Sequence, residues 1–293
     1  MKILFISPGN YPDYQCDSLF HGLRCLLGDS VVDVNKIPYI YKTFPQDERI
    51  KLYGKGFSLY GLLDDVEVDR EDVENKIRTR YFDLVVYGSV WRCQDFLPLV
   101  FESYSPGEII FVDGEDYPKI LLPFLTRGIY FKRELYSENR WVYPIHLAMP
   151  EEKFVKDIAS LEKTNFFAPC NPTDRTTYVY ETEESYYKQY QESFYGVTMK
   201  KAGWDCLRHY EIISQGCAPY FYEIYDCPHL TMHRFPRYEV LKLMAIADDY
   251  FREGNFDLQG YITNLECLYA YAKKHLTTIA LAKYLIDTWK QSQ

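Results

Sequence analysis

The sequence predicts an α/β protein of two doubly wound domains with a helical C-terminus. Short apolar segments alternate with helix-length segments through both halves of the chain, which is typical of parallel sheets joined by crossover helices. The clearest unit spans residues 195–222 and reads as strand, basic loop, helix, glycine turn and strand. A proline-containing acidic segment at 148–152 separates the two halves, so we expect domains at residues 1–147 and 148–293.

The N-terminal half begins with the apolar segment KILFIS, which predicts a first strand ending before Pro8 and Gly9. Further near-continuous apolar segments predict buried parallel strands. The expected strands are residues 2–7, 31–34, 82–87, 109–112, 129–131 and 141–146, and the expected helices are 17–27, capped by Asp17, and 95–104. The GxGxxG fingerprint of dinucleotide-binding domains is absent. Residues 36–62 show no clean periodicity and are expected to form an irregular insertion.

The C-terminal half is expected to continue the alternation and then to end in amphipathic helices. Asp205 is placed to cap the helix of the central unit, and Gly216 is placed to end it. The expected strands are 165–168, 195–199 and 218–222. The other expected helices are 181–194, 238–253, 257–273 and 275–290.

The composition is that of a soluble globular protein with an acidic balance. Lysine and arginine total 33 against 42 aspartates and glutamates, which gives a net charge of −9. Binding of nucleic acid depends on many cationic contacts with phosphates, so this charge argues against a nucleic-acid partner. No apolar segment approaches the roughly 18 to 20 residues that span a bilayer, and the first strand is too short for a signal peptide. These observations predict a cytoplasmic protein without a membrane span.

The central unit gathers charged residues around the start of its helix. Lys200 and Lys201 lie in the loop before the helix, and Arg208 and Glu211 lie three residues apart on one helical face. Ligands of open α/β sheets bind where strand C-termini meet helix N-termini, and the backbone N–H groups there favour phosphate. The sequence therefore points to this unit as the first place to look for a ligand site.

The segment from Arg208 to Pro219 carries the pattern R-x-x-E followed by G-C-x-P. This pattern resembles the donor-binding motif of glycosyltransferases with the GT-B architecture, most of all the exostosin-like and spore-coat-type branches. The resemblance covers a short motif and, in outline, the whole chain, and it implies two Rossmann-like domains of GT-B type with a cleft between them. Many retaining members carry a second glutamate where this chain has Gly203 and Trp204, so their paired-glutamate signature is missing here.

The resemblance implies that the C-terminal domain binds a nucleotide-diphosphate sugar. Glu211 would accept hydrogen bonds from the ribose hydroxyls. Lys200, Lys201 and Arg208 would hold the diphosphate and stabilise the charge that develops on the leaving nucleotide. Because protein cations would neutralise the leaving group, neither a metal nor a further cofactor is expected. The eight scattered cysteines contain no CxxC pair and are expected to be free thiols.

A carboxylate or histidine from the N-terminal domain would deprotonate the acceptor hydroxyl. Asp113, Glu115 and Asp116 follow a predicted strand, and His21 lies in the first predicted helix, so these four residues are the candidate catalytic groups. The structural alternatives are a turn with exposed acids and an ordinary helix histidine.

The predicted function is thus that of a hexosyltransferase-like glycosyltransferase, which moves a sugar from a nucleotide-diphosphate sugar to a hydroxyl of a glycan or another acceptor. Two other functions stay open on the same scaffold. A nucleotide-sugar epimerase would turn over the donor without an acceptor, and a non-catalytic module would bind the nucleotide or sugar without turnover. A nucleic-acid acceptor is a weaker alternative because of the net charge. The sequence leaves the sugar, the base, the acceptor and the stereochemical outcome undetermined.

Overall fold

The computed structural model describes residues 1–292, and its N-terminal half is built on a six-stranded sheet. All neighbouring strands are parallel, in the order β2-β1-β3-β4-β5-β6. The strands are β1 (Ile3–Ile6), β2 (Val31–Asp33), β3 (Leu84–Tyr87), β4 (Ile109–Asp113), β5 (Ile129–Lys132) and β6 (Val142–Pro144). All six were predicted from the sequence, with ends that differ by a residue or two.

Helices cover both faces of this sheet, as a doubly wound domain requires. They are α1 (Tyr14–Leu27), α3 (Val73–Arg78), α4 (Leu97–Ser103) and, from the end of the chain, α9 (Thr278–Gln291), while the short α2 (Gln46–Arg49) lies in the insertion and buries none of its residues. Successive strand residues point to opposite faces. Ile3 and Phe5 therefore pack in the core shared with α1 and α9, while Leu4 and Ile6 pack in the core shared with α3 and α4. Burial on both faces explains why these strands are apolar throughout.

The first helix begins earlier than the sequence predicted. Asp13, rather than Asp17, is its N-cap, because Oδ1 of Asp13 accepts hydrogen bonds from the backbone N–H groups of Gln15 (3.0 Å) and Cys16 (3.2 Å). The carboxylate of Asp17 is buried instead and accepts a hydrogen bond from the hydroxyl of Tyr60 (3.0 Å). Burial raises the pKa of Asp17 well above its usual value.

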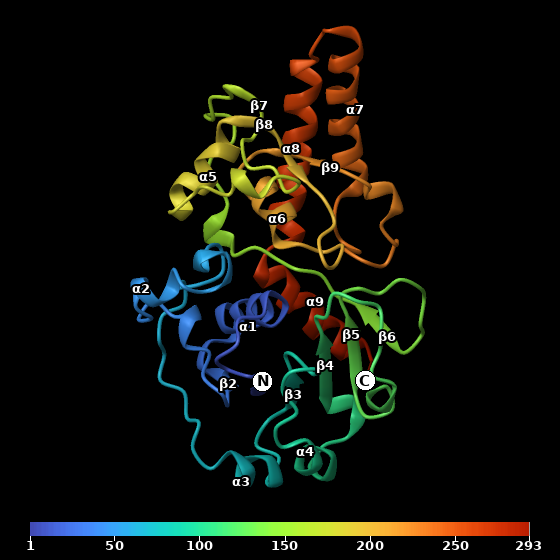
Figure 1. Ribbon diagram of the computed structural model, residues 1–293. Coiled ribbons are helices and arrows are strands. Elements are labelled where there is room, and N and C mark those ends of the chain that lie inside the picture. Colours follow the sequence, from blue (N-terminus) through green and yellow to red (C-terminus); the bar gives the residue numbers. More distant parts are fainter. Residues whose placement is uncertain (293) are drawn as a thin grey trace.

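The C-terminal half contains a smaller parallel sheet in the order β7-β8-β9. Its strands are β7 (Asn165–Phe167), β8 (Ser193–Thr198) and β9 (Ala218–Phe221), and its helices are α5 (Glu183–Gln191), α6 (Leu207–Ser214), α7 (Arg237–Glu253) and α8 (Leu258–His275). The α7 and α8 helices stand side by side and project from this half (Figure 1). The predicted α/β class with two parallel-sheet units and a helical C-terminus is confirmed.

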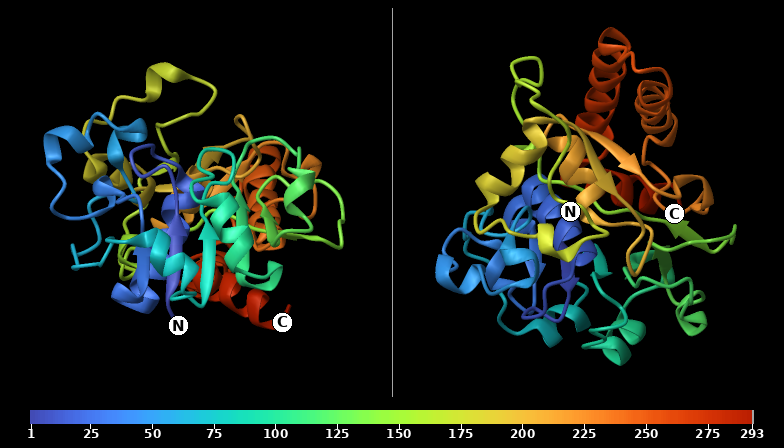
Figure 2. Two further views of the ribbon diagram at one scale, coloured as in Figure 1. Left: turned by 90° about the horizontal axis from the view of Figure 1, so that it is seen from below. Right: turned by 45° about the horizontal axis from the view of Figure 1, so that its top comes forward.

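The last helix returns to the N-terminal half. Figure 1 shows α9 beneath the C-terminal unit, and the end of the chain lies beside the first sheet in the left view of Figure 2; the contacts of α9 with α1 place it against that sheet. The backbone N–H of Thr278 donates to the carbonyl of Met149 (2.9 Å), which ties the start of α9 to the segment after β6. The close approach of α1 and α9 depends on Gly22, where a Cβ atom would lie 1.9 Å from the carbonyl oxygen of Thr278.

Two histidines lie where the two halves meet. His146 follows β6, and His233 lies in the loop before α7, with ring centroids 5.1 Å apart; the ring of Tyr284 on α9 is 5.1 Å from that of His233. Burial, with a smaller contribution from the positive charge of Arg234, lowers the pKa of His146 to about 4 and that of His233 to about 2. Both rings are therefore neutral in the folded protein at neutral pH.

Stability is expected to fall in acid because of these buried rings. Unfolded histidines bind protons below a pKa of about 6.5, whereas the folded rings do not, so protonation favours the unfolded state as the pH falls from 6.5 to 5. Asp205 opposes this trend, since burial raises its pKa to about 6. The His233→Phe variant should therefore show a shallower loss of stability, by about 1.4 kcal/mol per pH unit. Urea unfolding at pH 7, 6 and 5 measures the slope, and equal slopes in both proteins would contradict the prediction.

None of the helices formed within residues 1–292 is both long and apolar enough to cross a membrane. The cysteines of this part of the chain are free.

Candidate functional site

The two halves face each other across a cleft with two connected lobes. The aromatic lobe has a volume of about 430 Å³, and the charged lobe has a volume of about 580 Å³. The aromatic lobe is characterised by Phe57, Tyr178, Tyr180, Tyr186, Arg208 and Glu211. The charged lobe is characterised by Asp13, Gln15, Arg92, Asp116, Arg133 and Lys201. The two lobes share the wall residues Tyr14, Leu52, Tyr53, Cys206 and Leu207, so they form one continuous cleft.

The charged lobe lies at the C-terminal edge of the first sheet. Asp13 follows β1, Arg92 follows β3, Asp116 follows β4, Arg133 follows β5 and Leu147 follows β6, and all five line this lobe. Because the strands are parallel, the loops after them converge on one edge, which is where open α/β sheets bind their ligands. The position of the lobe is therefore a consequence of the sheet topology.

The α6 helix supplies the main cationic group of the aromatic lobe. Its N-cap is Cys206 rather than the predicted Asp205, and the side chain of Cys206 accepts no hydrogen bond from the first turn of the helix. Asp205 is buried instead, accepting hydrogen bonds from the backbone N–H of Leu147 (2.8 Å) and the hydroxyl of Tyr210 (2.7 Å). The guanidinium of Arg208 lies 5.0 Å from the ring of Tyr178, and no carboxylate within residues 1–292 forms an ion pair with it.

Glu211, one turn along α6 from Arg208, lines the same lobe and is 7% exposed. Its carboxylate accepts hydrogen bonds from two hydroxyls, those of Ser58 and of Tyr186 (2.8 Å). Burial raises the pKa of Glu211, although the two hydroxyl groups and Arg208 act in the opposite direction. The carboxylate of Glu211 thus accepts hydrogen bonds from two hydroxyl groups at the same time.

Ser58 brings the insertion of the N-terminal half into this site. Its backbone has a φ of 72°, a left-handed conformation that costs energy for a residue with a side chain. The backbone N–H of Ser58 donates to Glu183 (2.6 Å), and nearby Lys55 forms an ion pair with Glu181 (2.7 Å). Residues 36–62, predicted to be irregular, therefore form a bridge from the first half to α5 and α6.

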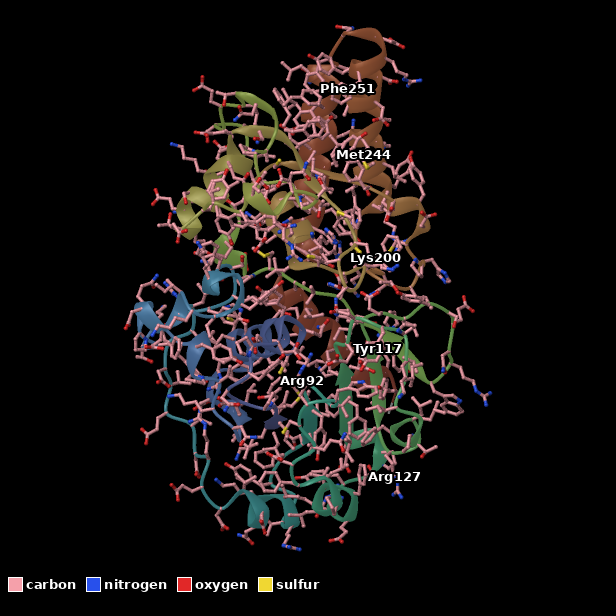
Figure 3. The ribbon with its side chains drawn as sticks, in the orientation of Figure 1. Arg92, Tyr117, Arg127, Lys200, Met244 and Phe251 are labelled. Carbon is pink, nitrogen blue, oxygen red and sulfur yellow. The ribbon has the colours of Figure 1, made fainter. Side chains whose placement is uncertain are left out.

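The two predicted lysines differ in position. Lys201 lines the charged lobe, and its ammonium donates to the carbonyl of Pro172 (2.7 Å). Partial burial lowers the pKa of Lys201, and the positive charge of Arg208 lowers it further, so the two cations share one region of the cleft. Lys200 instead packs over the ring of Trp204, 4.9 Å from its centre, and lies near the edge of the C-terminal half that faces Tyr117 (Figure 3).

The three predicted carboxylates after β4, Asp113, Glu115 and Asp116, differ in their exposure and in their partners. Asp113 is fully buried, where it forms an ion pair with Lys132 (2.7 Å) and accepts a hydrogen bond from the hydroxyl of Tyr130 (2.6 Å). Glu115 forms an ion pair with Arg92 (2.9 Å). These contacts give Asp113 a role in the core, away from any acceptor.

Asp116 is the member of the cluster that lines the cleft. Its side chain is 49% exposed and forms an ion pair with Arg133, whose other donors reach the carbonyls of Gly114 and Asp205. A Cβ atom on Gly203 would lie 2.9 Å from Oδ1 of Asp116, so this carboxylate lies directly opposite the loop that precedes α6. The structure thus brings Asp116 to the side of the cleft where Lys201 is located.

His21 does not reach the cleft. It is 1% exposed on α1, where Nδ1 lies 2.9 Å from the hydroxyl of Thr278 and Nε2 lies 3.4 Å from a carboxylate oxygen of Glu152. His21 therefore belongs to the contact between α1 and α9, as the alternative of an ordinary helix histidine proposed.

Comparison with known proteins identifies only distant structural similarity. No protein-family model matches the chain, and no curated protein matches it. The chain is similar to a solved α-glucosyltransferase in complex with UDP and a 13-mer DNA containing a central A:G mismatch, with a TM-score of 0.48 and 11% identity over 98% of this chain and 99% of that one. It is also similar to an α-glucosyltransferase in complex with UDP, with a TM-score of 0.46 and 11% identity over 98% and 99% of the two chains. Similarity at this level carries no functional argument, so function must be inferred from the cleft.

Several residues in or beside the cleft were not singled out from the sequence, and Ser58, Tyr186 and Gln15 are examples. Ser58 lies in the insertion, Tyr186 lies on α5, and Gln15 follows the cap of α1. Gln15 lines the charged lobe, and its buried amide Oε1 has no hydrogen-bond partner within residues 1–292. No spacing in the sequence connects these positions, because each reaches the cleft through tertiary packing.

Within residues 1–292 no group of three or more histidine, cysteine and acidic side chains is arranged to hold a metal ion.

Proposed function

We propose that the protein is a glycosyltransferase that moves a sugar from a nucleotide-diphosphate sugar to an acceptor hydroxyl. One observation carries the proposal. Arg208, which forms no ion pair with any residue of 1–292, and Glu211, which accepts hydrogen bonds from two hydroxyl groups, lie one turn apart on α6 and line the same lobe of an interdomain cleft. A cation and a diol acceptor at this separation suit the diphosphate and the ribose of one nucleotide.

The diphosphate would lie at the start of α6. Arg208 can donate two parallel hydrogen bonds to phosphate oxygens. The first turn of the helix adds backbone N–H groups, and Lys201 adds a second cation nearby. These groups would stabilise the negative charge that develops on the nucleotide as the bond to the sugar breaks. In this mechanism the protein cations replace a metal ion as the charge-stabilising groups.

The ribose and the base would occupy the rest of the aromatic lobe. The two ribose hydroxyls would donate to Glu211 in the manner of Ser58 and Tyr186. The rings of Phe57 and Tyr186 are stacked with centroids 5.8 Å apart and offer an aromatic surface for the base. This lobe combines contributions from both halves of the chain, so the donor site is complete only when the halves are together.

The acceptor would enter through the charged lobe. Asp116 is the best-placed general base, because its half-exposed carboxylate faces the loop before α6 from the opposite wall. Its proton acceptance would leave the acceptor oxygen free to attack the anomeric carbon. The unpaired Oε1 of Gln15 can accept a further hydrogen bond from an acceptor hydroxyl.

The donor site can be tested by calorimetric titration with UDP, GDP, ADP and CDP and with their 2′,3′-dideoxy forms. We expect one ribonucleotide to bind about tenfold or more tightly than its dideoxy form, because hydrogen bonds to a carboxylate contribute about 1.5–3 kcal/mol. The Glu211→Gln variant should lose most of this difference. Glu184→Gln, which alters an exposed glutamate on α5, is the control and should retain it. Equal binding of the two forms, or no nucleotide binding, would refute the donor site.

The role of Asp116 as the general base is tested by the Asp116→Asn variant. Release of nucleotide from the selected sugar donor, with water as the acceptor, is expected to slow by about 10²- to 10⁴-fold. Affinity for the nucleotide should stay unchanged, because Asp116 lies in the charged lobe. A wild-type protein that binds the donor without turnover would indicate a binding module, and conversion of the sugar without nucleotide release would indicate an epimerase.

A further inference from the structure

Two arginines in this protein differ from the other buried and half-buried arginines in the partners of their guanidinium groups. The others each donate to a carboxylate or a carbonyl, and they are Arg24, Arg49, Arg70, Arg133 and Arg237. Within residues 1–292, Arg208 and Arg234 donate to neither, and each lies against a tyrosine ring, at 5.0 Å and 4.4 Å from its centre. A guanidinium has five N–H donors, and donors that lack a protein partner are available to water or to an anion.

Arg234 lies outside the cleft, in a pocket of about 330 Å³ between the loop before α7, the end of α8 and one face of α9. The α9 residues that line it recur every three or four positions, so they share one helical face. Its charged lining consists of Arg234, Lys274, Lys283 and Asp287. No ion pair joins any of the three cations to a carboxylate within residues 1–292. The pocket is therefore cationic within a chain whose net charge is −9.

The positive potential of this pocket extends to its neighbours. Partial burial lowers the pKa of His275, and the charges of Lys274 and Arg234 lower it further. Arg234 acts in the same direction on His146 and His233 at the junction of the two halves. The cations are thus close enough to act on a common group, and among the residues that line the pocket Asp287 is the acidic one, against three cations.

We infer that this pocket binds a phosphate group, carried by a soluble phosphorylated molecule or by a phospholipid headgroup. Arg234, held over the ring of Tyr284, would present its planar N–H groups to the phosphate, and Lys274 and Lys283 would approach from the end of α8 and the side of α9. Asp287 would face a hydroxyl group on the same ligand. The bound group would connect the loop that carries His233 to α9, the helix that packs on the N-terminal half.

The binding test uses the full chain carrying Arg208→Gln, so that phosphate binding in the cleft is weakened. Thermal unfolding is followed against inorganic phosphate and glycerol 3-phosphate, with chloride at matched ionic strength as the reference. The melting temperature should rise with either phosphate compound. Adding Lys283→Gln, an exposed position that should not disturb folding, should weaken the apparent affinity about tenfold or more, and Arg234→Gln should do the same.

Lys273→Gln is the matched control, because it removes the same charge from the end of α8 at a position that does not line the pocket. Equal losses for Lys273→Gln and Lys283→Gln would show nonspecific attraction and overturn the inference. Flotation with phosphatidylcholine vesicles, with and without phosphatidylglycerol, distinguishes the two sources. Vesicle binding that depends on Lys283 indicates a headgroup, and a thermal shift without vesicle binding indicates a soluble ligand. The absence of both would overturn the inference, whatever the outcome at the cleft.

Discussion

Replacing Arg208 with glutamine is expected to weaken binding of the nucleoside diphosphate by about 10- to 100-fold. Hydrogen bonds from a charged donor to phosphate contribute about 1.5–3 kcal/mol, and 1.4 kcal/mol corresponds to a factor of ten. The loss should be larger for the diphosphate than for the nucleoside, because Glu211 and the aromatic rings would still hold the ribose and the base. Calorimetric titration of both ligands measures this difference directly.

Two further variants show whether the geometry or the charge of the Arg208 side chain is responsible for the affinity for the diphosphate. Arg208→Lys keeps the charge but loses the planar pair of donors, so it should recover only part of the affinity. Arg252→Gln removes an exposed arginine from α7 and should leave binding unchanged. If Arg208→Gln bound the diphosphate as tightly as the wild type does, the assignment of the diphosphate to the start of α6 would be wrong.

Replacing Gly22 with alanine is expected to destabilise the protein by about 3 kcal/mol or more, at the upper end of the usual range for overpacking. The added Cβ would lie 1.9 Å from the carbonyl oxygen of Thr278 and 3.2 Å from the Cβ of Ala282. A backbone carbonyl in the first turn of α9 cannot move aside as a flexible side chain can. The helices α1 and α9 would therefore have to separate, which exposes the core that they share.

Chemical unfolding measures the loss of stability, and hydrogen exchange of the α9 amides shows whether that helix detaches first. Gly254→Ala is the control, because its Cβ would meet nothing within 4 Å and the cost is limited to a φ of 75°. That cost is about 1 kcal/mol. Equal losses for the two variants would show that the contact between α1 and α9 does not limit stability.

The predictions for Arg208 and Gly22 both depend on contacts between the two halves of the chain, of which the Ser58 bridge is one. A segment of the N-terminal half contacts Glu211 in the aromatic lobe, and α9 connects the C-terminal half to α1. Both connections cross between the halves, so the cleft depends on their relative position. We expect the Gly22→Ala variant to bind nucleotide more weakly as well, although Gly22 lies outside both lobes.

The sequence by itself determined the fold class and the position of the most informative helix. Strands buried on both faces must be apolar throughout, and a helix that starts after a buried strand must present its first turn at the sheet edge. These local rules suffice to place six strands of the first sheet and to select Arg208 and Glu211, which lie three residues apart on one face of α6.

Tertiary structure alone decided which charged residues are accessible in the cleft. Asp113 and Asp116 look alike in the sequence, yet Asp113 is held by Lys132 in the core, whereas Asp116 is half exposed in the cleft. Likewise, His21 is covered by a helix from the far end of the chain. The burial and the partner of a side chain depend on segments distant in sequence, and for that reason the contact of Ser58 with Glu211 had no local signal.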